Sequence, residues 1–272
     1  MQFSDSLCAR IQKPKWLNCG TELALEEKVV TQSIEEMENI ELAVWDKLKD
    51  LNWLDNLSNK LSELRWLLPK FSLYERQFRE AHSVLELGGG EGWAACVVKH
   101  LYPQIWIAAS DISESAISGI GKWERIFEAK VDMRFSCRSY KVPLPDNSVD
   151  LIFTFQAAHH FRLHEETLKE LGRVLRAGGT CIYIHEPSCR SYIYPLARWR
   201  VNRKRPECPE DVLCFERLRE AAAKFGFRME VNYSTPTINR GVVEGVYYKV
   251  LSAFPFLCRW LPCTADFVFS KV

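Results

Sequence analysis

Several features that would indicate a metal-binding, membrane-spanning or nucleic-acid-binding protein are missing from this chain of 272 residues. Its ten cysteines are scattered with no CxxC pair, so the close thiol pairs of a zinc ribbon are absent and we expect no metal site. The formal net charge is only +1, which gives no overall attraction to nucleic acid or to anionic lipid. No apolar run approaches the roughly 18 residues that span a bilayer, and the first residues lack the basic start and apolar core of a secretory leader. We therefore expect a cytoplasmic protein with reduced thiols, no transmembrane segment and no nucleic-acid partner.

Length and composition indicate a folded α/β domain preceded by a helical piece. Hydrophobic residues make up 47% of the chain and charged residues 26%, which is enough for a proper core. We expect residues 1–82 to form an N-terminal helical extension and residues 83–272 to form the main domain. Within the extension, residues 21–68 are dense in glutamate and repeat apolar residues at helical spacing, which predicts helices ending at Pro69. A short helix over 71–81 should follow, and we interpret the acidic run as a solvated helix face.

From residue 83 onward the predicted strands and helices alternate, which is typical of a doubly wound sheet. The expected fold is α/β, with a seven-stranded, mostly parallel, Rossmann-like sheet. Its predicted strands are 83–87, 105–110, 132–137, 149–155, 179–185, 227–233 and 265–271, and its predicted helices are 92–101, 114–128, 164–176 and 210–225. Two insertions, near 186–209 and 236–262, are too long for ordinary connections and are expected to form lids.

One glycine-rich stretch says most about a ligand. In residues 83–92 a short apolar run leads into Glu86, and glycines follow at alternate positions. Strand, glycine turn and helix in that order let a ligand lie against the backbone. Asp111 ends the next apolar run, and a carboxylate there can accept hydrogen bonds from two hydroxyl groups. Two acids at successive strand ends favour a ligand with hydroxyls and an amine over a bare phosphate.

A dinucleotide site agrees less well with the same residues. Glu86 would repel a pyrophosphate, and the third glycine follows the second by two positions where the dinucleotide fingerprint has three. A plain glycine turn without a ligand would leave Asp111 unexplained.

Five motifs, in order along the chain, resemble those of one enzyme family. They are residues 86–92, 111–113, 143–150, 158–160 and 171–179. The first resembles the ExGxGxG motif of class I S-adenosylmethionine-dependent methyltransferases, and the second resembles their acidic motif. The remaining three resemble the landmarks of the small-molecule branch often called type 11. The resemblance covers roughly 83–187 and implies a methyltransferase domain with S-adenosylmethionine as its cofactor.

The resemblance also implies a set of cofactor-binding residues. Glu86 would lie near the cofactor's amino-acid ammonium, Asp111 would accept from both ribose hydroxyls, and Ile112 would lie against the adenine. The full expected set is Glu86, Gly88, Gly89, Gly90, Gly92, Asp111, Ile112, Ser139 and Gln156. Where the family usually has an adenine-binding Asp, this chain has Arg138, which cannot accept a hydrogen bond. Either Ser139 or a backbone carbonyl replaces it, or the local alignment with the family is shifted; reduced cofactor affinity or lost activity are the other outcomes.

Three side chains are candidates for catalysis. His159 and His160 follow the fourth predicted strand, at the sheet edge where ligands bind, and a neutral imidazole there can take a proton from an acceptor. Glu186, at the end of the fifth predicted strand, could orient the acceptor. Alternatively, the histidines only shape the loop, and Glu186 only bonds to lid backbone.

The function that these residues predict is methyl transfer to a small-molecule acceptor, at oxygen or carbon, by in-line displacement. The acceptor is expected to be apolar, covered by the aromatic insertion, or acidic, held by the basic segment 198–205, which can equally be a solvated loop. A homodimer contact through the aromatic insertion is a further possibility. Two alternatives stay open: a fold that binds the cofactor without transferring methyl, and methylation of a macromolecule.

Overall fold

The computed structural model of the chain describes residues 25–48, 53–203, 210–235 and 242–272. Its α-helices are α2 Leu25–Leu48, α3 Trp53–Leu73, α4 Glu75–Glu80, α5 Trp93–Leu101, α6 Glu114–Ser118, α7 Gly121–Ile126, α8 His164–Val174, α9 Tyr194–Asn202, α10 Phe215–Lys224 and α11 Val242–Ala253. Its 3-10 helices are η1 Ala158–His160, η2 Ser191–Ile193 and η3 Pro255–Arg259. Its strands are β1 Ser83–Leu87, β2 Trp106–Asp111, β3 Met133–Ser136, β4 Val149–Phe155, β5 Leu175–Cys189, β6 Leu213–Cys214, β7 Phe227–Ser234 and β8 Cys263–Lys271.

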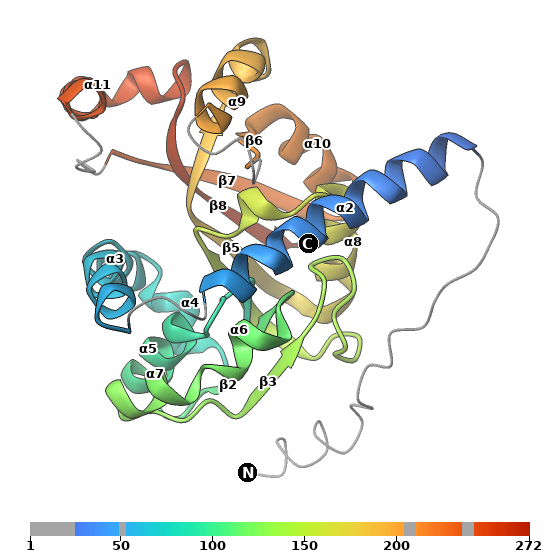
Figure 1. The fold of residues 1–272 in the computed structure, drawn as a ribbon, viewed down its shortest axis with the longest axis vertical. Helices are drawn as coiled ribbons and strands as arrows, with labels where there is room; N and C mark the ends of the chain where they lie inside the picture. The colour runs from blue at the N-terminus through green and yellow to red at the C-terminus, as the bar shows by residue number, and fades with distance from the viewer. Residues whose placement is uncertain (1–24, 49–52, 204–209, 236–241) are drawn as a thin grey trace.

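The strands form one sheet in the order β3-β2-β1-β4-β5-β8-β7, with the two-residue β6 beside β5 (Figure 1). Strands β1 to β5 pair in parallel, whereas β8 runs antiparallel to both β5 and β7. The chain proceeds from β1 to one side through β2 and β3, and then returns to the other side through β4. This reversal beside β1 opens a crevice at the carboxyl ends of the strands, which is where open α/β sheets bind ligands.

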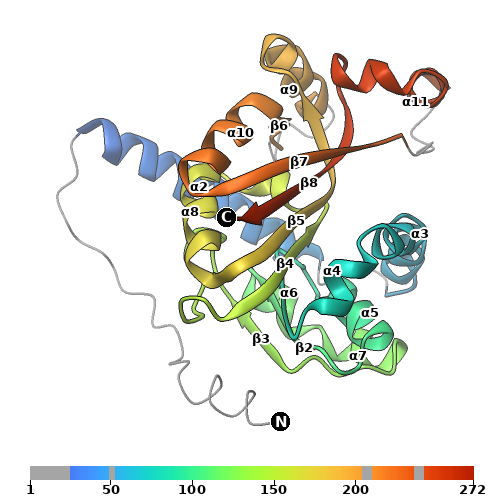
Figure 2. The same cartoon turned by 180° about the vertical axis from the view of Figure 1, so that it is seen from behind.

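Helices cover both faces of the sheet (Figures 1 and 2). The wholly buried strand β1 explains why: with both faces buried, it is stable only between two helical layers. Helices α4, α5 and α7 pack on one face around the buried Phe78 and Trp123, and α8 and α10 pack on the other around Leu168 and Leu218. None of the described helices combines the length and apolar character needed to cross a membrane.

The helices before the sheet differ from the prediction at their end. Pro69 lies inside α3, which continues to Leu73, so the prediction that the helical region ends at Pro69 was wrong. The missing amide of a proline weakens a helix, but Leu67 and Phe71 on either side are buried in the core and hold α3 across it. The shorter helix α4 then begins at Glu75, inside the expected range 71–81.

Three further predictions need correction. The helix expected over 114–128 is two helices, α6 and α7, separated at Gly119 and Ile120. The fifth strand runs on to Cys189, past its predicted end at 185, because β8 pairs with it as far as Ser188. The insertion expected from 186 therefore begins inside the sheet. The pairing of β5 with residues 213–214 adds an eighth strand, in a range predicted to be helical.

Candidate active site

A cleft of about 990 Å³ opens at the carboxyl edge of the sheet. Its floor is the glycine loop after β1, the loop after β2 and the residues after β4. Helices α2 and α3 supply side chains to one wall, and Val201 of α9 and Tyr248 of α11 supply the opposite wall. The volume is at the upper end of small-molecule sites, so one cleft has room for a cofactor and an acceptor together.

The glycine loop approaches the cleft with its backbone bare. Gly88, Gly90 and Gly92 have φ of +72°, +58° and +72°, a left-handed conformation that other residues rarely adopt. A Cβ on Gly88 would lie 3.0 Å from Ala157, and one on Gly90 would lie 2.7 Å from the Trp45 ring of α2. These glycines are therefore needed both for the turn and for the close approach of what lies over it.

Glu86 supports this loop from beneath. Its side chain is buried, accepts a hydrogen bond from the Ala95 amide at 3.0 Å and lies under Gly89, where a Cβ would be 2.5 Å from its carboxyl carbon. Burial raises the pKa of Glu86 to about 8, against the lowering effect of the Ala95 amide. Glu86 is not among the residues that line the cleft, so any contact with a ligand ammonium remains a prediction.

Asp111 does line the cleft, and its carboxylate is fixed by the backbone around it. Its Oδ2 accepts from the Gly90 amide at 2.7 Å and its Oδ1 from the Ser113 amide at 2.9 Å. Burial raises the pKa of Asp111 to about 6, although these amides oppose the shift. The contact to Gly90 ties the two predicted cofactor loops into one unit.

The remaining cofactor candidates also line the cleft. Ile112, Ser139 and Gln156 all face it, with Ser139 Oγ 2.8 Å from Thr167 Oγ1. Gln156, in the turn after β4, has φ of +51°, a left-handed conformation that is strained for a residue with a side chain. All of the expected set except Glu86 and Gly92 are thus lining residues.

Arg138 has a different partner from any that the sequence suggested. Its Nε donates to Oε2 of Glu38 in α2 at 2.6 Å, and Tyr140 donates to Oε1 of the same carboxylate at 2.8 Å. Glu38 is only 5% exposed, so interpreting the whole acidic run as a solvated face was wrong at this position. Sequence analysis missed Glu38, Glu41 and Trp45 as wall residues, because the spacing along the helix does not show what this face contacts.

Glu186 is a fully buried carboxylate that organises the turn after β4. Its Oε1 accepts from the amides of Ala157 and Ala158 at 2.9 Å each, and its Oε2 lies 2.7 Å from Nδ1 of His159. Burial alone would lower the pKa of His159, but the adjacent Glu186 carboxylate outweighs it and the pKa is raised. His159 lines the cleft and Glu186 does not, so in this structure Glu186 bears on the cleft through the imidazole that it holds.

The His160 ring lies against that of His159, with centroids 4.2 Å apart and planes tilted by 40°, and its Nδ1 is 3.9 Å from Glu41 Oε1. Burial, reinforced by the charge of Asp111, raises the pKa of Glu41 to about 7. One ligand atom each from His159, His160 and Glu210 lie within 4.8 Å of one another, so this trio could hold a divalent cation.

The cleft is acidic. Its lining includes seven carboxylates (Glu38, Glu41, Asp55, Glu63, Glu91, Asp111 and Glu210) against three basic side chains (Lys60, Arg138 and Arg162). The exposed Arg198, Trp199, Arg200 and Arg203 of the basic segment are not among its lining residues, and Lys204 and Arg205 lie outside the described residues. The geometry therefore does not support the hypothesis that the basic segment 198–205 binds an acidic acceptor.

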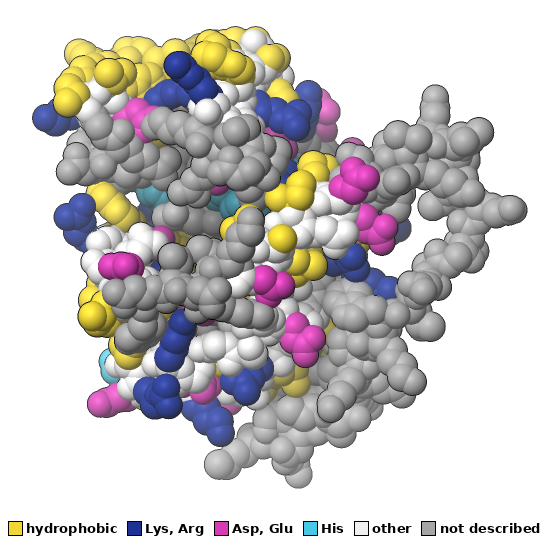
Figure 3. Space-filling model, viewed as in Figure 1, with side chains coloured by type: hydrophobic (Ala, Val, Ile, Leu, Met, Phe, Trp, Pro, Cys, Tyr) yellow, Lys and Arg dark blue, Asp and Glu magenta, His cyan; other side chains and the backbone are white. Residues whose placement is uncertain are grey.

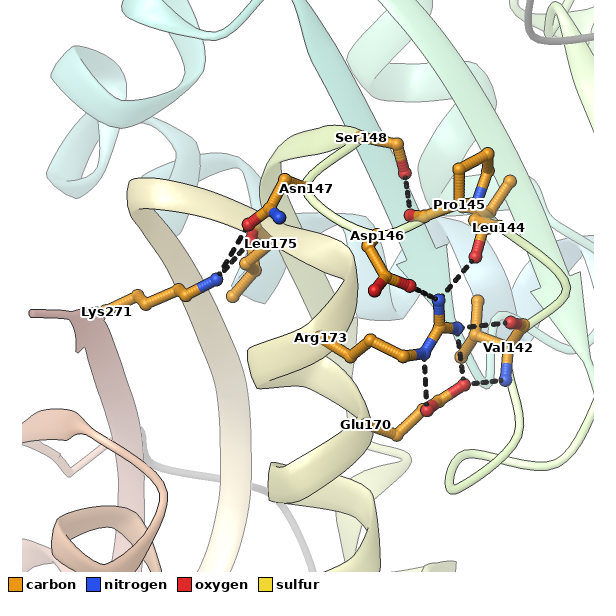
Figure 4. A network of polar contacts seen from close by, with 10 residues as sticks. All are labelled: Val142, Leu144, Pro145, Asp146, Asn147, Ser148, Glu170, Arg173, Leu175 and Lys271. Atoms are coloured by element: carbon orange, nitrogen blue, oxygen red, sulfur yellow. Dashed lines mark hydrogen bonds and ion pairs between the residues drawn. The ribbon is translucent and has the colours of Figure 1, made fainter.

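The motifs at residues 143–150 and 171–179 meet through one side chain, Arg173. Arg173 binds the carbonyl oxygens of Val142 and Leu144 at 2.9 Å each, together with the carboxylates of Asp146 and Glu170 (Figure 4). One guanidinium thus holds the loop before β4 against α8. The seven cysteines that the structure describes are all free and buried, as expected for reduced thiols, while Cys8, Cys19 and Cys208 lie outside the described residues.

Comparison with known proteins identifies the domain. Residues 85–183 match the family described as methyltransferase domain. A ubiquinone/menaquinone biosynthesis C-methyltransferase of Cupriavidus taiwanensis is 30% identical over 112 residues, which are 40% of this chain and 45% of that protein. A probable S-adenosylmethionine-dependent methyltransferase of Mycobacterium tuberculosis is 31% identical over 100 residues, which are 36% of this chain and 34% of that protein. The chain thus spans less than half the length of these relatives.

Solved structures share the fold. The geranyl diphosphate C-methyltransferase of Streptomyces coelicolor A3(2), solved with S-adenosylhomocysteine, superposes with a TM-score of 0.61 at 12% identity, covering 76% of this chain and 80% of that one. S-adenosylmethionine is the cofactor of this family of enzymes. Residues 85–183, which contain the glycine loop and Asp111, belong to the class I S-adenosylmethionine-dependent methyltransferases, in the type 11 branch.

Proposed function

We propose that this chain transfers a methyl group from S-adenosylmethionine to a neutral, largely apolar small molecule, at oxygen or carbon. The observation that carries the proposal is one cleft that holds both the Asp111 carboxylate and the His159 imidazole, the latter anchored by the buried Glu186. A cofactor site and a group able to accept a proton thus open onto the same space.

The residues present fit the cofactor. The bare glycine backbone gives the close approach that it needs, and Asp111 offers carboxylate oxygens to ribose hydroxyls. The excess of carboxylates in the cleft suits a ligand that carries a positive charge. When bound, S-adenosylmethionine supplies a methyl group activated by a positively charged sulfur. The same excess disfavours an anionic acceptor, which is why we prefer a neutral one.

His159 is proposed to accept the proton of the acceptor. Its Nδ1–H donates to Glu186, an assignment made from the hydrogen bond, which leaves Nε2 as the acceptor nitrogen. The raised pKa makes the neutral ring a stronger base. The cleft walls hold the acceptor in line and limit access of water.

Two measurements on the full-length chain test this proposal. Calorimetry with S-adenosylhomocysteine should show binding that Asp111→Ala weakens by tenfold or more; absence of binding at millimolar ligand would end the cofactor assignment. Incubation with methyl-labelled S-adenosylmethionine and a cell extract should place label in an organic-soluble small molecule. Binding without any labelled product, small or macromolecular, would favour a cofactor-binding protein without transferase activity, and label in protein or RNA would favour a macromolecular acceptor.

A further inference from the structure

One surface outside the cleft concentrates the exposed apolar side chains of the described residues. Ten of the eighteen large ones lie in two stretches, residues 192–199 in η2 and α9 and residues 242–260 in and around α11 and η3 (Figures 1 and 3). They include Leu196, Trp199, Val242, Val243, Phe256 and Trp260, with Val242 84% and Trp199 58% exposed. All the exposed aromatic side chains in the described part of the chain belong to it. We call this surface the outer face; single exposed apolar residues are ordinary, but a contiguous group with several aromatics marks an interaction site.

The outer face is one surface built from two segments of the chain. The Tyr192 hydroxyl donates to the carbonyl oxygen of Trp260, and Arg190 Nε donates to the carbonyl oxygen of Arg259 at 2.7 Å. Further along, Arg200 pairs with Glu244 at 3.2 Å, which joins α9 to α11. The two apolar segments are therefore held beside each other on the same side of the protein.

The charges on these segments are nearly all positive. Residues 191–203 and 242–260 carry Arg198, Arg200, Arg203, Lys249 and Arg259, against Glu244 as the one carboxylate. This contrasts with the acidic cleft and with a net charge of +1 for the whole chain. Figure 3 shows basic side chains beside the crest of hydrophobic ones. Tryptophan, aliphatic residues and arginine side by side are the composition of surfaces that sit at the boundary between lipid headgroups and acyl chains.

We propose that the outer face docks on an anionic lipid bilayer. The apolar side chains would enter the boundary region, while the cations bind the negative headgroups. A second copy of the chain is a poorer occupant, because a two-fold contact would place the same cations against one another. Docking at a bilayer surface requires no membrane-spanning helix, and none of the described helices is long and apolar enough to be one.

Docking would also place the cleft beside the lipid. Val201 of α9 and Tyr248 of α11 line the cleft, so the two helices that carry the outer face also form a cleft wall. This consequence rests on the proposed function: an acceptor dissolved in the bilayer would reach the cleft past these helices. Docking itself does not depend on methyl transfer, so each can fail without the other.

Sedimentation with large unilamellar vesicles tests the proposal on the full-length chain. The protein should bind vesicles of phosphatidylcholine with about 30% phosphatidylglycerol at least several-fold more tightly than vesicles of phosphatidylcholine alone, and added salt should weaken this binding. A triple variant, Trp199→Ser, Phe256→Ser and Trp260→Ser, should reduce the partition coefficient by roughly tenfold or more. Arg198→Glu with Arg203→Glu should reduce it on the anionic vesicles in particular.

The matched control is Leu73→Ser, Leu101→Ser and Ile126→Ser, three exposed apolar residues on α3, α5 and α7. It should leave vesicle binding unchanged, and circular dichroism should show every variant folded. Equal binding by the outer-face and control variants would overturn the proposal, as would absence of vesicle binding by the parent chain. A concentration-dependent dimer that the triple variant abolishes, without vesicle binding, would reassign the outer face to self-association.

Discussion

Arg138 donates from Nε to the Oε2 of Glu38 at 2.6 Å, which joins the loop after β3 to helix α2. Counted back from Pro143, Arg138 stands where the resemblance implies an adenine-binding Asp, and here it binds a residue of the cleft wall. Tyr140 donates to the same carboxylate, so Glu38 receives two hydrogen bonds from that loop. The departure from the family pattern thus coincides with an added structural link between α2 and the sheet.

Removing this link should weaken cofactor binding. Arg138→Ala would leave the buried Glu38 carboxylate without its cation and loosen α2, so we expect the Kd for S-adenosylhomocysteine to rise about tenfold. Glu38→Gln should have a similar but smaller effect, and the double variant should cost less than the sum of the two. Arg76→Ala, which breaks an exposed pair with Glu80, is the control and should change nothing. Strictly additive losses in calorimetry would show that the two side chains do not act together.

Cofactor binding should depend on pH through Asp111. Its pKa is raised to about 6, and protonation removes the charge that attracts ribose hydroxyl donors. We expect the Kd for S-adenosylhomocysteine to rise towards tenfold per unit below about pH 6 as the Asp111 carboxylate takes up a proton. The Asp111→Asn variant should bind weakly at every pH, and the rise of its Kd at acid pH (the acid limb) should be absent. An unchanged acid limb in Asp111→Asn would assign the titration to another group.

The raised pKa of His159 should depend on Glu186. Glu186→Gln keeps one oxygen for the backbone amides but loses the charge, so the pKa of the ring should fall, because burial then acts without an opposing carboxylate. An NMR titration of the His159 ring measures this without any acceptor. In turnover, where the neutral ring acts, the acid limb of kcat/KM should move to lower pH while the maximal rate drops by roughly ten- to hundredfold.

The control for this measurement is Glu165→Gln, which removes an exposed carboxylate paired with Lys224. It should leave the His159 titration where it is. A Glu186→Gln variant that lowers the rate at every pH without moving the limb would mean that Glu186 only shapes the turn.

Treatment with a chelator distinguishes a His159 that acts as a base from a His159 that binds a metal ion. We expect prolonged treatment with EDTA to leave both S-adenosylhomocysteine binding and methyl transfer unchanged, because Nδ1 of His159 is bound to Glu186 and its other nitrogen is needed for the acceptor proton. Loss of activity that an added divalent cation restores would instead assign His159, His160 and Glu210 as a metal site.

Local pattern explains why much of the fold followed from the sequence, and why most of the expected cofactor residues line one cleft. Glycines at alternate positions after an apolar strand leave few other conformations, and the resulting turn lets the Gly90 amide donate to Asp111. Strand alternation likewise predicted the parallel order around β1. Such features depend on neighbours in sequence, where spacing carries the physical constraint.

Contacts distant in sequence could not be read in this way. Glu38 pairs with a residue 100 positions away, and the helical spacing around it is the same whether that face meets solvent or Arg138. The role of Glu186 depended on the length of β5, which pairing with β8 extends beyond what local propensity predicts. Tertiary packing also outweighed the helix-breaking tendency of Pro69, since α3 continues through it with Leu67 and Phe71 buried in the core.

Substitution at Gly89 should test how the glycine loop is held. A Cβ there would lie 2.5 Å from the Glu86 carboxyl carbon, and that side chain can move only by giving up its bond to the Ala95 amide in a buried place. Gly89→Ala should therefore lower the free energy of unfolding by ~1–3 kcal/mol and abolish measurable S-adenosylhomocysteine binding. Gly121→Ala, in α7 with open space around the added methyl, should leave both unchanged. Combining Gly89→Ala with Glu86→Ala should relieve the clash without restoring binding, because the carboxylate that supports the loop is then gone; full recovery of binding would show that Glu86 has no part in forming the site.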